Sequence, residues 1–437
     1  MSIKNNFFDR VEGIFKIMDV RIKANNVGGS VKILSSKSHL HRLILASVLA
    51  DKPTKIEYEG TLCSDVLATI GCVEKIGANV KIEKNSLYVT PIYSIPKENV
   101  SVCCGESGST LRFILPIFSA LGVSYKVDVK GRLKSRPLSP LDKIMANSGI
   151  TFSNMGVYPL SVSGKLNNNN FEIDGGVSSQ FITGLLFCLP LLGGGIVKVK
   201  GILQSKPYID ITTSVLRKFG ITVIENNNVY TVSGSYKSPT EVKSDGDWSN
   251  SAFFLTLGAI SNSVKVQGLN LESEQGDKKI IKILKEMGAL VEIQSDITVK
   301  KGTLKGVVID ASNIPDLVPI LSVCASVSQG KTEIINAERL KLKESDRIAS
   351  TVDMINSLGG CAKAKNDGIE IEGVPQLKGG IVNGVNDHRI VMASAIASAV
   401  SVNPVIIKDS QAVNKSYPDF FERLESLGFT FSYISKN

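Results

Sequence analysis

The sequence predicts an α/β protein of two domains, each built from three copies of one repeated unit. The first observation is a helix that ends at a glycine and leads into a short strand, six times along the 437 residues. The second is a helix that is apolar on almost every side, which also recurs six times. The third is length, because a chain of this size suits two domains of roughly 200 residues, each large enough to bury a core.

A glycine at the end of a helix marks each copy of the repeat. Successive marker glycines are 72, 71, 68, 71 and 69 residues apart. Glycine takes the left-handed turn after a helix at low steric cost. The alternating apolar residues that follow have the period of a strand. The six glycines are Gly77, Gly149, Gly220, Gly288, Gly359 and Gly428.

The apolar helices recur in phase with these glycines, at spacings of 71, 70, 70, 67 and 71 residues. A helix that is apolar on every face is buried on every face. None has the unbroken run of about 18 apolar residues that a membrane span needs, so we expect core helices and no membrane partner. A short strand follows each, and each unit reads strand, helix, strand, helix, strand. The helices begin near Ser38, Ser109, Ser179, Ser249, Asp316 and Asp387.

The net charge of +9 admits either a nucleic-acid partner or a site for small anions. Lysines and arginines are scattered and aromatic residues make up only 6%, so stacking platforms for bases are not visible and small anions are favoured. The seven cysteines lack the spacing of a metal site and are expected to be buried free thiols in a reducing compartment, with the cytoplasm as the expected location. Residues 1–17 precede the repeat and are predicted to be an extension without a catalytic role.

The buried helices begin with small polar residues at residues 36–38, 105–109 and 178–180. Such residues cap a helix, and the free N–H groups of the first turn attract anions. Gly108 would let an anion come close to the backbone. Plain capping explains any one of these starts. Several in phase, one of them containing Lys37, favour phosphate or carboxylate binding.

Basic side chains recur at loop positions that the repeat places at one end of the units. Guanidinium groups bind phosphate and carboxylate through paired hydrogen bonds, so a group of such side chains facing helix N-termini predicts an anion site. These residues are Arg132, Arg347, Arg389 and Lys415.

Acidic residues beside this predicted site have two interpretations. Asp210, Asp346 and Asp419 precede helices and are expected to be caps. Asp316 begins an apolar helix, where it can cap the helix or serve as an acid–base group. Glu344 stands between Lys343 and Arg347, and such neighbours can tune a carboxyl group for proton transfer.

Ten short motifs follow one another on matching elements of the repeat. They are Ser36-Lys37-Ser38 with Arg42, Glu106-Ser107-Gly108-Ser109 with Arg112, Gly131-Arg132 to Arg136-Pro137, Ser178-Ser179-Gln180, Ser205-Lys206-Pro207-Tyr208, Gln275-Gly276-Asp277, Ile314-Pro315-Asp316, Lys343-Glu344-Ser345-Asp346-Arg347, Asp387-His388-Arg389 and Lys415-Ser416-Tyr417-Pro418-Asp419. In this order they resemble the 5-enolpyruvylshikimate-3-phosphate synthase family of enolpyruvyl transferases, over about residues 20–437. Each motif is weak alone, but ten in order are highly specific.

The resemblance implies a two-domain inside-out α/β barrel, each domain of three βαβαββ units with helices inside and sheets outside. The chain would cross between domains near residues 35 and 243. One domain would then be residues 36–243, and the other residues 1–35 plus 244–437. Substrates would bind in the cleft, and their affinity for the shut form would close the domains.

The resemblance also implies a reaction: phosphoenolpyruvate gives its enolpyruvyl group to the 5-hydroxyl of 3-phosphoshikimate by addition and elimination, and phosphate leaves. Lys37 would touch both substrates, Asp316 would be the base facing the hydroxyl, and Glu344 would give a proton to carbon. No metal, organic cofactor or nucleic acid is implied, and a monomer is expected. The implied 3-phosphoshikimate site is Lys37, Ser38, Arg42, Ser178, Ser179, Gln180, Ser205, Tyr208, Asp316 and Lys343, and the implied phosphoenolpyruvate site is Lys37, Gly108, Arg132, Gln180, Arg347, Arg389 and Lys415.

Two residues depart from the family pattern and are left out of this predicted site. Many members have Asn in place of Glu106, and some have Asn in place of Arg339.

Three rival functions are compatible with parts of the sequence. The enolpyruvyl transferase that acts on UDP-N-acetylglucosamine has Lys-Asn in place of Lys37-Ser38 and in most members a loop cysteine, which the stretch from Arg112 to Arg136 lacks. RNA 3′-terminal phosphate cyclase needs a histidine nucleophile near its C-terminus, whereas the last histidine here, His388, belongs to another motif. A non-enzymatic repeat scaffold for nucleic acid would show steeply salt-dependent binding and no turnover.

Overall fold

Six four-stranded sheets with one strand order form the framework of residues 18–435, the part of the chain that this computed structural model describes. The predicted extension, residues 1–17, lies outside the described residues. In every sheet one outer pair of strands is parallel and the other neighbours are antiparallel. The predicted repeat is therefore a structural one.

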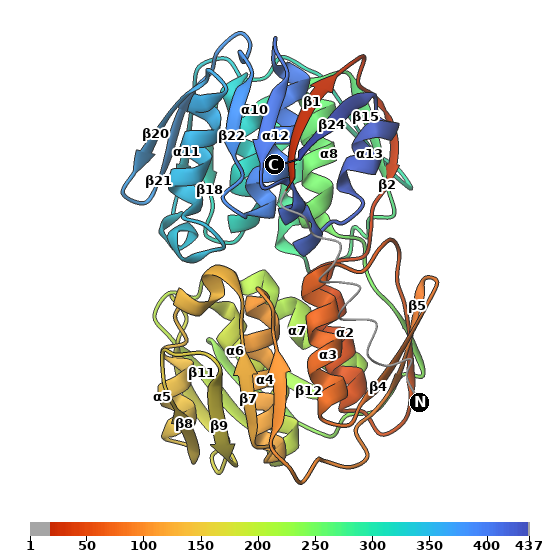
Figure 1. Cartoon of the computed structure of the whole chain (residues 1–437), viewed down its shortest axis with the longest axis vertical. Helices are drawn as coiled ribbons and strands as arrows, with labels where there is room; N and C mark the ends of the chain where they lie inside the picture. The colour runs from red at the N-terminus through yellow and green to blue at the C-terminus, as the bar shows by residue number, and fades with distance from the viewer. Residues whose placement is uncertain (1–17, 436–437) are drawn as a thin grey trace.

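Three sheets belong to what we call the inserted domain, made of elements α2 to β14 (Figure 1). Their outward residues are exposed and their inward residues buried, as alternation along a strand requires. In spatial order the strands are β14 (Glu241–Lys243), β3 (Thr54–Glu57), β5 (Ser86–Thr90) and β4 (Asn79–Glu83); β6 (Val100–Cys103), β7 (Tyr125–Asp128), β9 (Leu160–Gly164) and β8 (Ile150–Ser153); and β10 (Asn170–Asp174), β11 (Gly195–Lys200), β13 (Val229–Ser233) and β12 (Thr222–Asn226).

The other three sheets belong to what we call the split domain, made of β1, β2 and elements α8 to β24. The first and last strands of the described chain, β1 and β24, pair with each other along their whole length. In spatial order the strands are β22 (Gly380–Asn383), β23 (Val405–Lys408), β1 (Met18–Ala24) and β24 (Phe429–Ser435); β16 (Leu290–Ile293), β17 (Ile297–Lys300), β15 (Ser263–Gln267) and β2 (Gly29–Lys32); and β18 (Val308–Asp310), β19 (Lys331–Ile335), β21 (Gly368–Glu372) and β20 (Cys361–Lys365).

The apolar helices predicted from the sequence form the interior of the two domains. Every residue of α10 and α12 is buried, which confirms that a helix without a polar face lies in the core. The buried apolar residues fall into two clusters, one in each domain. The core helices are α2 (Lys37–Val48), α4 (Gly108–Leu121), α6 (Ser179–Cys188), α8 (Trp248–Ile260), α10 (Val318–Ser326), which extends the 3-10 turn η4 (Pro315–Leu317), and α12 (His388–Ala397).

The second helix of each unit is amphipathic and ends where the sequence predicts. All six marker glycines have positive φ, between 80° and 106°, so the left-handed helix ends are confirmed. These helices are α3 (Ser64–Lys75), α5 (Leu141–Ala146), α7 (Lys206–Lys218), α9 (Ile280–Met287), α11 (Arg347–Ser357) and α13 (Phe420–Ser426). Short 3-10 helices complete the described chain: η1 (Gly131–Ser135), η2 (Leu189–Leu192), η3 (Gly276–Lys279), η5 (Glu338–Leu342), η6 (Ser398–Val400) and η7 (Ser410–Lys415).

One of the three expected acidic caps is present as predicted. Asp346 accepts from the backbone N–H groups of the first turn of α11. Asp210 lies inside α7, because Pro207 sits in the first turn and the helix starts earlier, and it pairs with Lys206 instead. Asp419 stands before α13 but makes no cap hydrogen bond through its side chain.

The chain passes between the two domains at two adjacent points. Ser35 and Gly246 form an isolated antiparallel bridge there, and Ser36 N donates to Asp245 O at 2.8 Å. Strand β14 then completes a sheet of the inserted domain, whereas β2 completes one of the split domain. The two crossings lie side by side, which is the geometry of a double-stranded hinge.

Five of the cysteines are buried free thiols, as expected for the group. The two others differ from that expectation, because Cys103 is only partly buried and Cys361 is exposed on strand β20.

Candidate functional site

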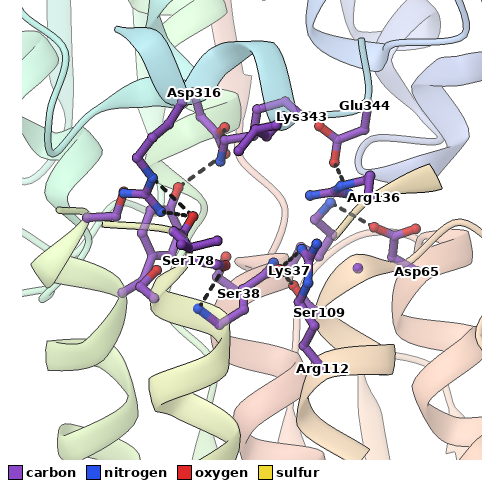
Figure 2. A pocket seen from close by; sticks show the side chains of 18 of the residues that line it. Lys37, Ser38, Asp65, Ser109, Arg112, Arg136, Ser178, Asp316, Lys343 and Glu344 are labelled. Carbon is purple, nitrogen blue, oxygen red and sulfur yellow. Dashed lines mark hydrogen bonds and ion pairs between the residues drawn. The ribbon is translucent and has the colours of Figure 1, made fainter. Parts of the chain in front are cut away.

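A cavity lies where the N-termini of core helices of the inserted domain face the split domain (Figure 2). Serines and basic side chains dominate its lining, so it suits anions. The inserted domain supplies Lys37, Ser38, Arg42, Asp65, Gly108, Ser109, Arg112, Arg136, Pro137, Val177, Ser178, Ser179, Gln180, Ser205 and Tyr208, and the split domain supplies Asp316, Arg339, Leu342, Lys343, Glu344, Arg347 and His388.

Lys37 is held at the start of α2 by contacts from both domains. Ser36 caps the helix by accepting from His39 N, and Lys37 N donates to Asp247 Oδ2 at 3.1 Å. The Lys37 ammonium lies 2.9 Å from Asp65 Oδ2. Burial alone would lower the pKa of Lys37, but the charge and hydrogen bond of Asp65, together with the nearby Cys63 and Glu344, outweigh it and the pKa stands above its usual value. Lys37 is therefore a fixed cation.

Two arginines flank the start of α4 at the wall of the cavity. Ser107 caps the helix and Gly108 follows, with the guanidinium groups of Arg112 and Arg136 beside it. A Cβ added to Gly108 would lie 2.9 Å from Arg136 Nη1 and 3.1 Å from Arg112 Nη1. Only glycine leaves the first turn of α4 and both arginines open to one ligand.

Gln180 connects this wall to the start of α6. Its side chain accepts from Arg112 Nη1 at 2.5 Å and donates to Ser109 Oγ at 2.9 Å. Burial, together with the charge of Arg136, lowers the pKa of Arg112 to about 9, which still leaves it charged at neutral pH. The amide thus fixes a charged guanidinium beside the helix N-terminus.

The other end of the cavity combines hydroxyl groups with two arginines. Ser178, Ser179 and Ser205 line this end. Arg42 lies behind it and donates to Ser38 O at 2.7 Å and to the Tyr208 carbonyl at 2.9 Å. These contacts are the kind that hold a phosphate among hydroxyl donors with a cation behind.

Arg339 reaches this serine-lined end from the split domain. It donates to Val177 O at 3.0 Å and to Ser205 Oγ at 3.2 Å. These hydrogen-bond acceptors, and Gln204 Oε1 beside them, are all neutral. The residue is not part of the predicted site, yet it lines the cavity.

Asp316 is the acidic centre of the split-domain wall. Its carboxylate lies 2.7 Å from Arg347 Nη1 and 3.3 Å from Arg389 Nη2, and it accepts from the Tyr208 hydroxyl at 3.1 Å. Burial acts to raise the pKa of Asp316, but Lys343, Arg389 and Arg347 outweigh it and hold the pKa well below its usual range. It makes no cap hydrogen bond in η4, so the capping interpretation is wrong.

Glu344 is an ion-paired carboxylate in this structure. Arg347 Nη2 lies 2.7 Å from one oxygen and Arg136 Nη1 lies 3.5 Å from the other. Burial would raise the pKa of Glu344, but these two arginines hold it well below its usual range. Lys343 beside it behaves oppositely, because burial lowers its pKa to about 8.

Three predicted cations do not line the cavity. Arg132 lies in η1 at the surface and donates to Lys341 O across the cleft at 3.3 Å. Arg389 lies behind Asp316, with Nη1 on Ser249 O at 3.0 Å. Lys415 ends η7, and its Nζ donates to Glu106 Oε2 at 2.8 Å. The expected loops are thus short 3-10 helices or helix starts, because Arg347 and Arg389 begin α11 and α12.

Nine residues that line the cavity are absent from the predicted site, and four of them, Asp65, Arg112, Arg136 and Arg339, are acidic residues or arginines. Arg112 and Arg136 stand in quoted motifs, and their residue type alone was a signal for anion binding. Arg339 was set aside for its departure from the family pattern. Asp65 carried no signal, since it meets Lys37 only after α3 packs beside α2.

Two features are absent from residues 18–435. No group of three or more His, Cys, Asp or Glu side chains in this range is placed to hold a metal ion. None of the helices in this range combines the length and apolarity that crossing a membrane requires.

The fold and the interdomain cavity define the class, a two-domain inside-out α/β protein with a cleft lined by serines and basic side chains. The EPSP synthase structure from Acinetobacter baumannii shares this fold, with a TM-score of 0.80 at 24% identity over 95% of this chain and 100% of that chain.

The sequence profile of EPSP synthase (3-phosphoshikimate 1-carboxyvinyltransferase) matches residues 22–424, and the chain belongs to this family. A 3-phosphoshikimate 1-carboxyvinyltransferase from Clostridium novyi (strain NT) is 41% identical over 425 residues, 94% of this chain and 97% of that protein. One from Brachyspira hyodysenteriae (strain ATCC 49526 / WA1) is 40% identical over 418 residues, covering 94% and 99%. The predicted family and fold class are confirmed.

Proposed function

We propose that this chain transfers the enolpyruvyl group of phosphoenolpyruvate to the 5-hydroxyl of 3-phosphoshikimate, releasing phosphate. Family membership over residues 22–424 carries this conclusion. The interdomain cavity supports it with a lining of serines and basic side chains and with two carboxylates, Asp316 and Glu344, on the wall of the split domain.

The serine-lined end is the proposed site of 3-phosphoshikimate. The hydroxyl groups of Ser178, Ser179 and Ser205 are donors for its phosphate, with Lys37 and Lys343 as cations. Ser38, Arg42 and Gln180 complete the wall of the inserted domain. Tyr208 and Asp316 then face the ring hydroxyl that reacts.

The arginine-lined end is the proposed site of phosphoenolpyruvate. Gly108 leaves the N-terminus of α4 open, and Lys37, Gln180 and Arg347 also line the cavity. Arg132, Arg389 and Lys415 join this set when η1, the start of α12 and η7 move towards the ligand. We retain them as proposed contacts on the strength of the family motifs.

Asp316 is the proposed base. Its depressed pKa keeps it ionised at neutral pH, and its Oδ2 already accepts a hydroxyl hydrogen from Tyr208. It would remove the proton from the 5-hydroxyl as that oxygen attacks the central carbon of phosphoenolpyruvate. In the elimination, the Glu344 carboxylate, ionised after giving its proton to carbon, would take a proton back from the methyl group of the tetrahedral adduct as phosphate leaves.

Glu344 is the proposed donor of the proton to the methylene carbon. It is ionised while Arg136 and Arg347 face it alone. An anionic substrate beside these arginines would cancel part of their charge and raise the carboxyl pKa, so that Glu344 can take up a proton before the addition. Lys343, with a pKa of about 8, is the neighbouring group able to exchange that proton.

The arrangement of the cores supports the proposed domain boundaries, residues 36–243 for one domain and residues 1–35 plus 244–437 for the other. A monomeric enzyme in the cytoplasm stays a prediction.

Phosphate release tests the proposed function directly. The full chain is incubated with phosphoenolpyruvate and either 3-phosphoshikimate or UDP-N-acetylglucosamine. Release with 3-phosphoshikimate alone is expected. Release with the nucleotide sugar alone, or with neither, would overturn the proposal.

A further inference from the structure

Glu106 links the two domains through an ion pair that the proposed mechanism does not use. Glu106 Oε2 accepts from Lys415 Nζ at 2.8 Å, and both its oxygens lie 3.1 Å from Asn386 Nδ2. Lys415 Nζ also donates to the Asn386 carbonyl at 2.6 Å. The ammonium of Lys415 is therefore engaged inside the protein, and the residue does not line the cavity.

The carboxylate of Glu106 is fixed on its own domain. A Cβ added to Gly131, whose φ is +54°, would clash with the Glu106 carboxyl group, so this glycine provides the space that it occupies. Lys130 N holds the turn by donating to Gly105 O at 2.7 Å. Glu106 is thus presented to the split domain from a fixed turn at the start of α4.

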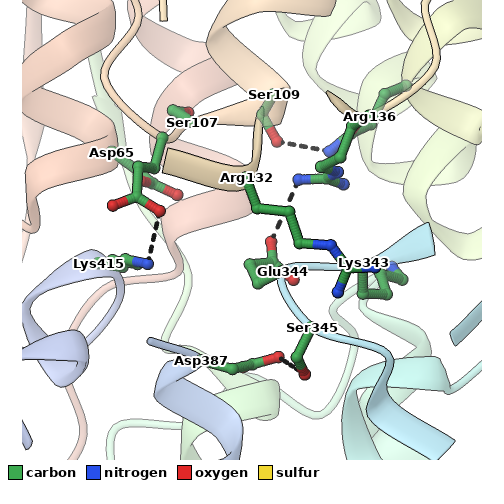
Figure 3. Close-up of polar contacts among 12 residues, drawn as sticks. Asp65, Ser107, Ser109, Arg132, Arg136, Lys343, Glu344, Ser345, Asp387 and Lys415 are labelled. Atoms are coloured by element: carbon green, nitrogen blue, oxygen red, sulfur yellow. Dashed lines mark hydrogen bonds and ion pairs between the residues drawn. The ribbon is translucent and has the colours of Figure 1, made fainter. Parts of the chain in front are cut away.

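This position puts a negative charge at the edge of an anion site. Glu106 is two residues from Gly108, which lines the cavity beside Arg112 and Arg136. Figure 3 shows Lys415 facing the turn that carries Ser107. The side chains of Lys415 and Glu106 are 11% and 26% exposed, so water screens their interaction only in part.

We propose that Glu106 acts as an internal anion that competes with phosphoenolpyruvate for Lys415. This inference rests on the proposed function, in which Lys415 serves the phosphoenolpyruvate end. The carboxylate holds Lys415 and the two domains together in the absence of substrate. The anionic groups of phosphoenolpyruvate then displace the carboxylate from Lys415. Part of the binding free energy of the substrate is therefore spent on breaking this ion pair.

The opposite role would be support, in which Glu106 orients Lys415 towards the substrate. The two roles predict opposite changes in the affinity for phosphoenolpyruvate when the charge of Glu106 is removed. Glu106→Gln keeps the shape and the hydrogen-bonding oxygen but removes the charge. Competition predicts tighter binding of phosphoenolpyruvate in this variant, whereas support predicts weaker binding.

The experiment measures KM for phosphoenolpyruvate at saturating 3-phosphoshikimate, and KM for 3-phosphoshikimate at saturating phosphoenolpyruvate. We expect Glu106→Gln to lower the KM for phosphoenolpyruvate by about 3- to 10-fold, the scale of one partly screened charge, and to leave the KM for 3-phosphoshikimate unchanged. Glu172→Gln is the matched control, because Glu172 pairs with Lys200 on an exposed sheet surface.

An unchanged or raised KM for phosphoenolpyruvate in Glu106→Gln would overturn the inference. The proposed function would still stand in that case, provided that the wild type turns over its substrates. Absence of turnover by the wild type would instead refute the proposed function. A melting temperature within the range of the control excludes misfolding, and equilibrium binding of phosphoenolpyruvate to the complex with 3-phosphoshikimate gives the same comparison for a variant with low turnover.

Discussion

Tyr208 and Asp316 belong to different domains, yet the Tyr208 hydroxyl donates to Asp316 Oδ2 at 3.1 Å. The contact aims a carboxylate that is already bound by Arg347 and Arg389. It also places the proposed base at the boundary between the two proposed substrate sites. The orientation of Asp316 therefore depends on the approach of the inserted domain.

Replacing Asp316 by Asn is expected to lower kcat by roughly 10²- to 10⁴-fold, the usual contribution of a general base. Tyr208→Phe removes one hydrogen bond to the base but leaves its charge, so we expect a loss below about tenfold. Phosphate release and circular dichroism measure activity and fold. Equal losses in the two variants would contradict the assignment of the base to Asp316.

The pKa of Lys343 predicts the direction in which kcat/KM changes with pH. Burial lowers its pKa to about 8, so the free enzyme carries this cation below that pH and loses it above. Since kcat/KM reports the free enzyme, we expect kcat/KM for 3-phosphoshikimate to fall above about pH 8. Lys343→Arg should retain its value to higher pH, whereas Lys341→Arg, a change at a half-buried residue of η5 that does not line the cavity, should behave as the wild type. An identical fall in all three proteins would contradict the role of Lys343.

Glu344 should make the free energy of unfolding depend on pH in the acidic range. Its folded pKa lies well below the unfolded value of 4.5, so its ionised form stabilises the fold fully above that pH. The stabilisation is lost as pH falls through the folded pKa. We expect the difference in Tm between wild type and Glu344→Gln to be largest near neutral pH and to shrink below pH 4.5. Glu98→Gln, at an exposed position, is the control and should change Tm only slightly at every pH. A Tm difference that shrinks in acid in the same way for Glu98→Gln would contradict the role given to Glu344.

Arg339 is expected to matter for 3-phosphoshikimate rather than for phosphoenolpyruvate. Its guanidinium contacts Ser205 Oγ and the Val177 carbonyl at the serine-lined end. Arg339→Met should raise the KM for 3-phosphoshikimate by about tenfold, the value of one charge-assisted contact of 1.5 kcal/mol or so. Arg217→Met, on the exposed side of α7, is the control. A larger effect on phosphoenolpyruvate would show that the ends of the cavity are assigned the wrong way round.

Gly184 tests the packing that supports the arginine wall. A Cβ at this position of α6 would lie 2.5 Å from Arg112 O and 2.7 Å from Pro116 Cγ of α4. Gly184→Ala should therefore force the two helices apart and lower the free energy of unfolding by about 1–3 kcal/mol. Chemical denaturation measures this change. Unaltered stability would mean that α4 adjusts without cost.

Local chemistry explains how much of the fold was predictable. The helix ends follow from glycines that take positive φ, and the helix starts follow from caps such as Ser36, Ser107 and Asp387. Strand partners are not a local property. Nothing in the neighbourhood of β2 or β14 alone shows that they join sheets of different domains, and that arrangement came only from the family resemblance.

The predicted site was recovered where residues lie on helix starts and was incomplete where contacts cross between elements. Lys37, Gly108 and Gln180 line the cavity because helix N-termini point into it. Lys415 does not line the cavity, and its ammonium instead pairs with Glu106 of the other domain. Such pairings depend on tertiary approach, which no spacing in the sequence encodes.

The pairing of β1 with β24 has a consequence for synthesis on the ribosome. The inserted domain has all of its strands once Lys243 has been made, so it can fold while the rest of the chain is still being translated. The sheet that contains β1 cannot close until Phe429–Ser435 emerges. The nascent strand β1 must therefore remain without either neighbouring strand until β23 (Val405–Lys408) has been made.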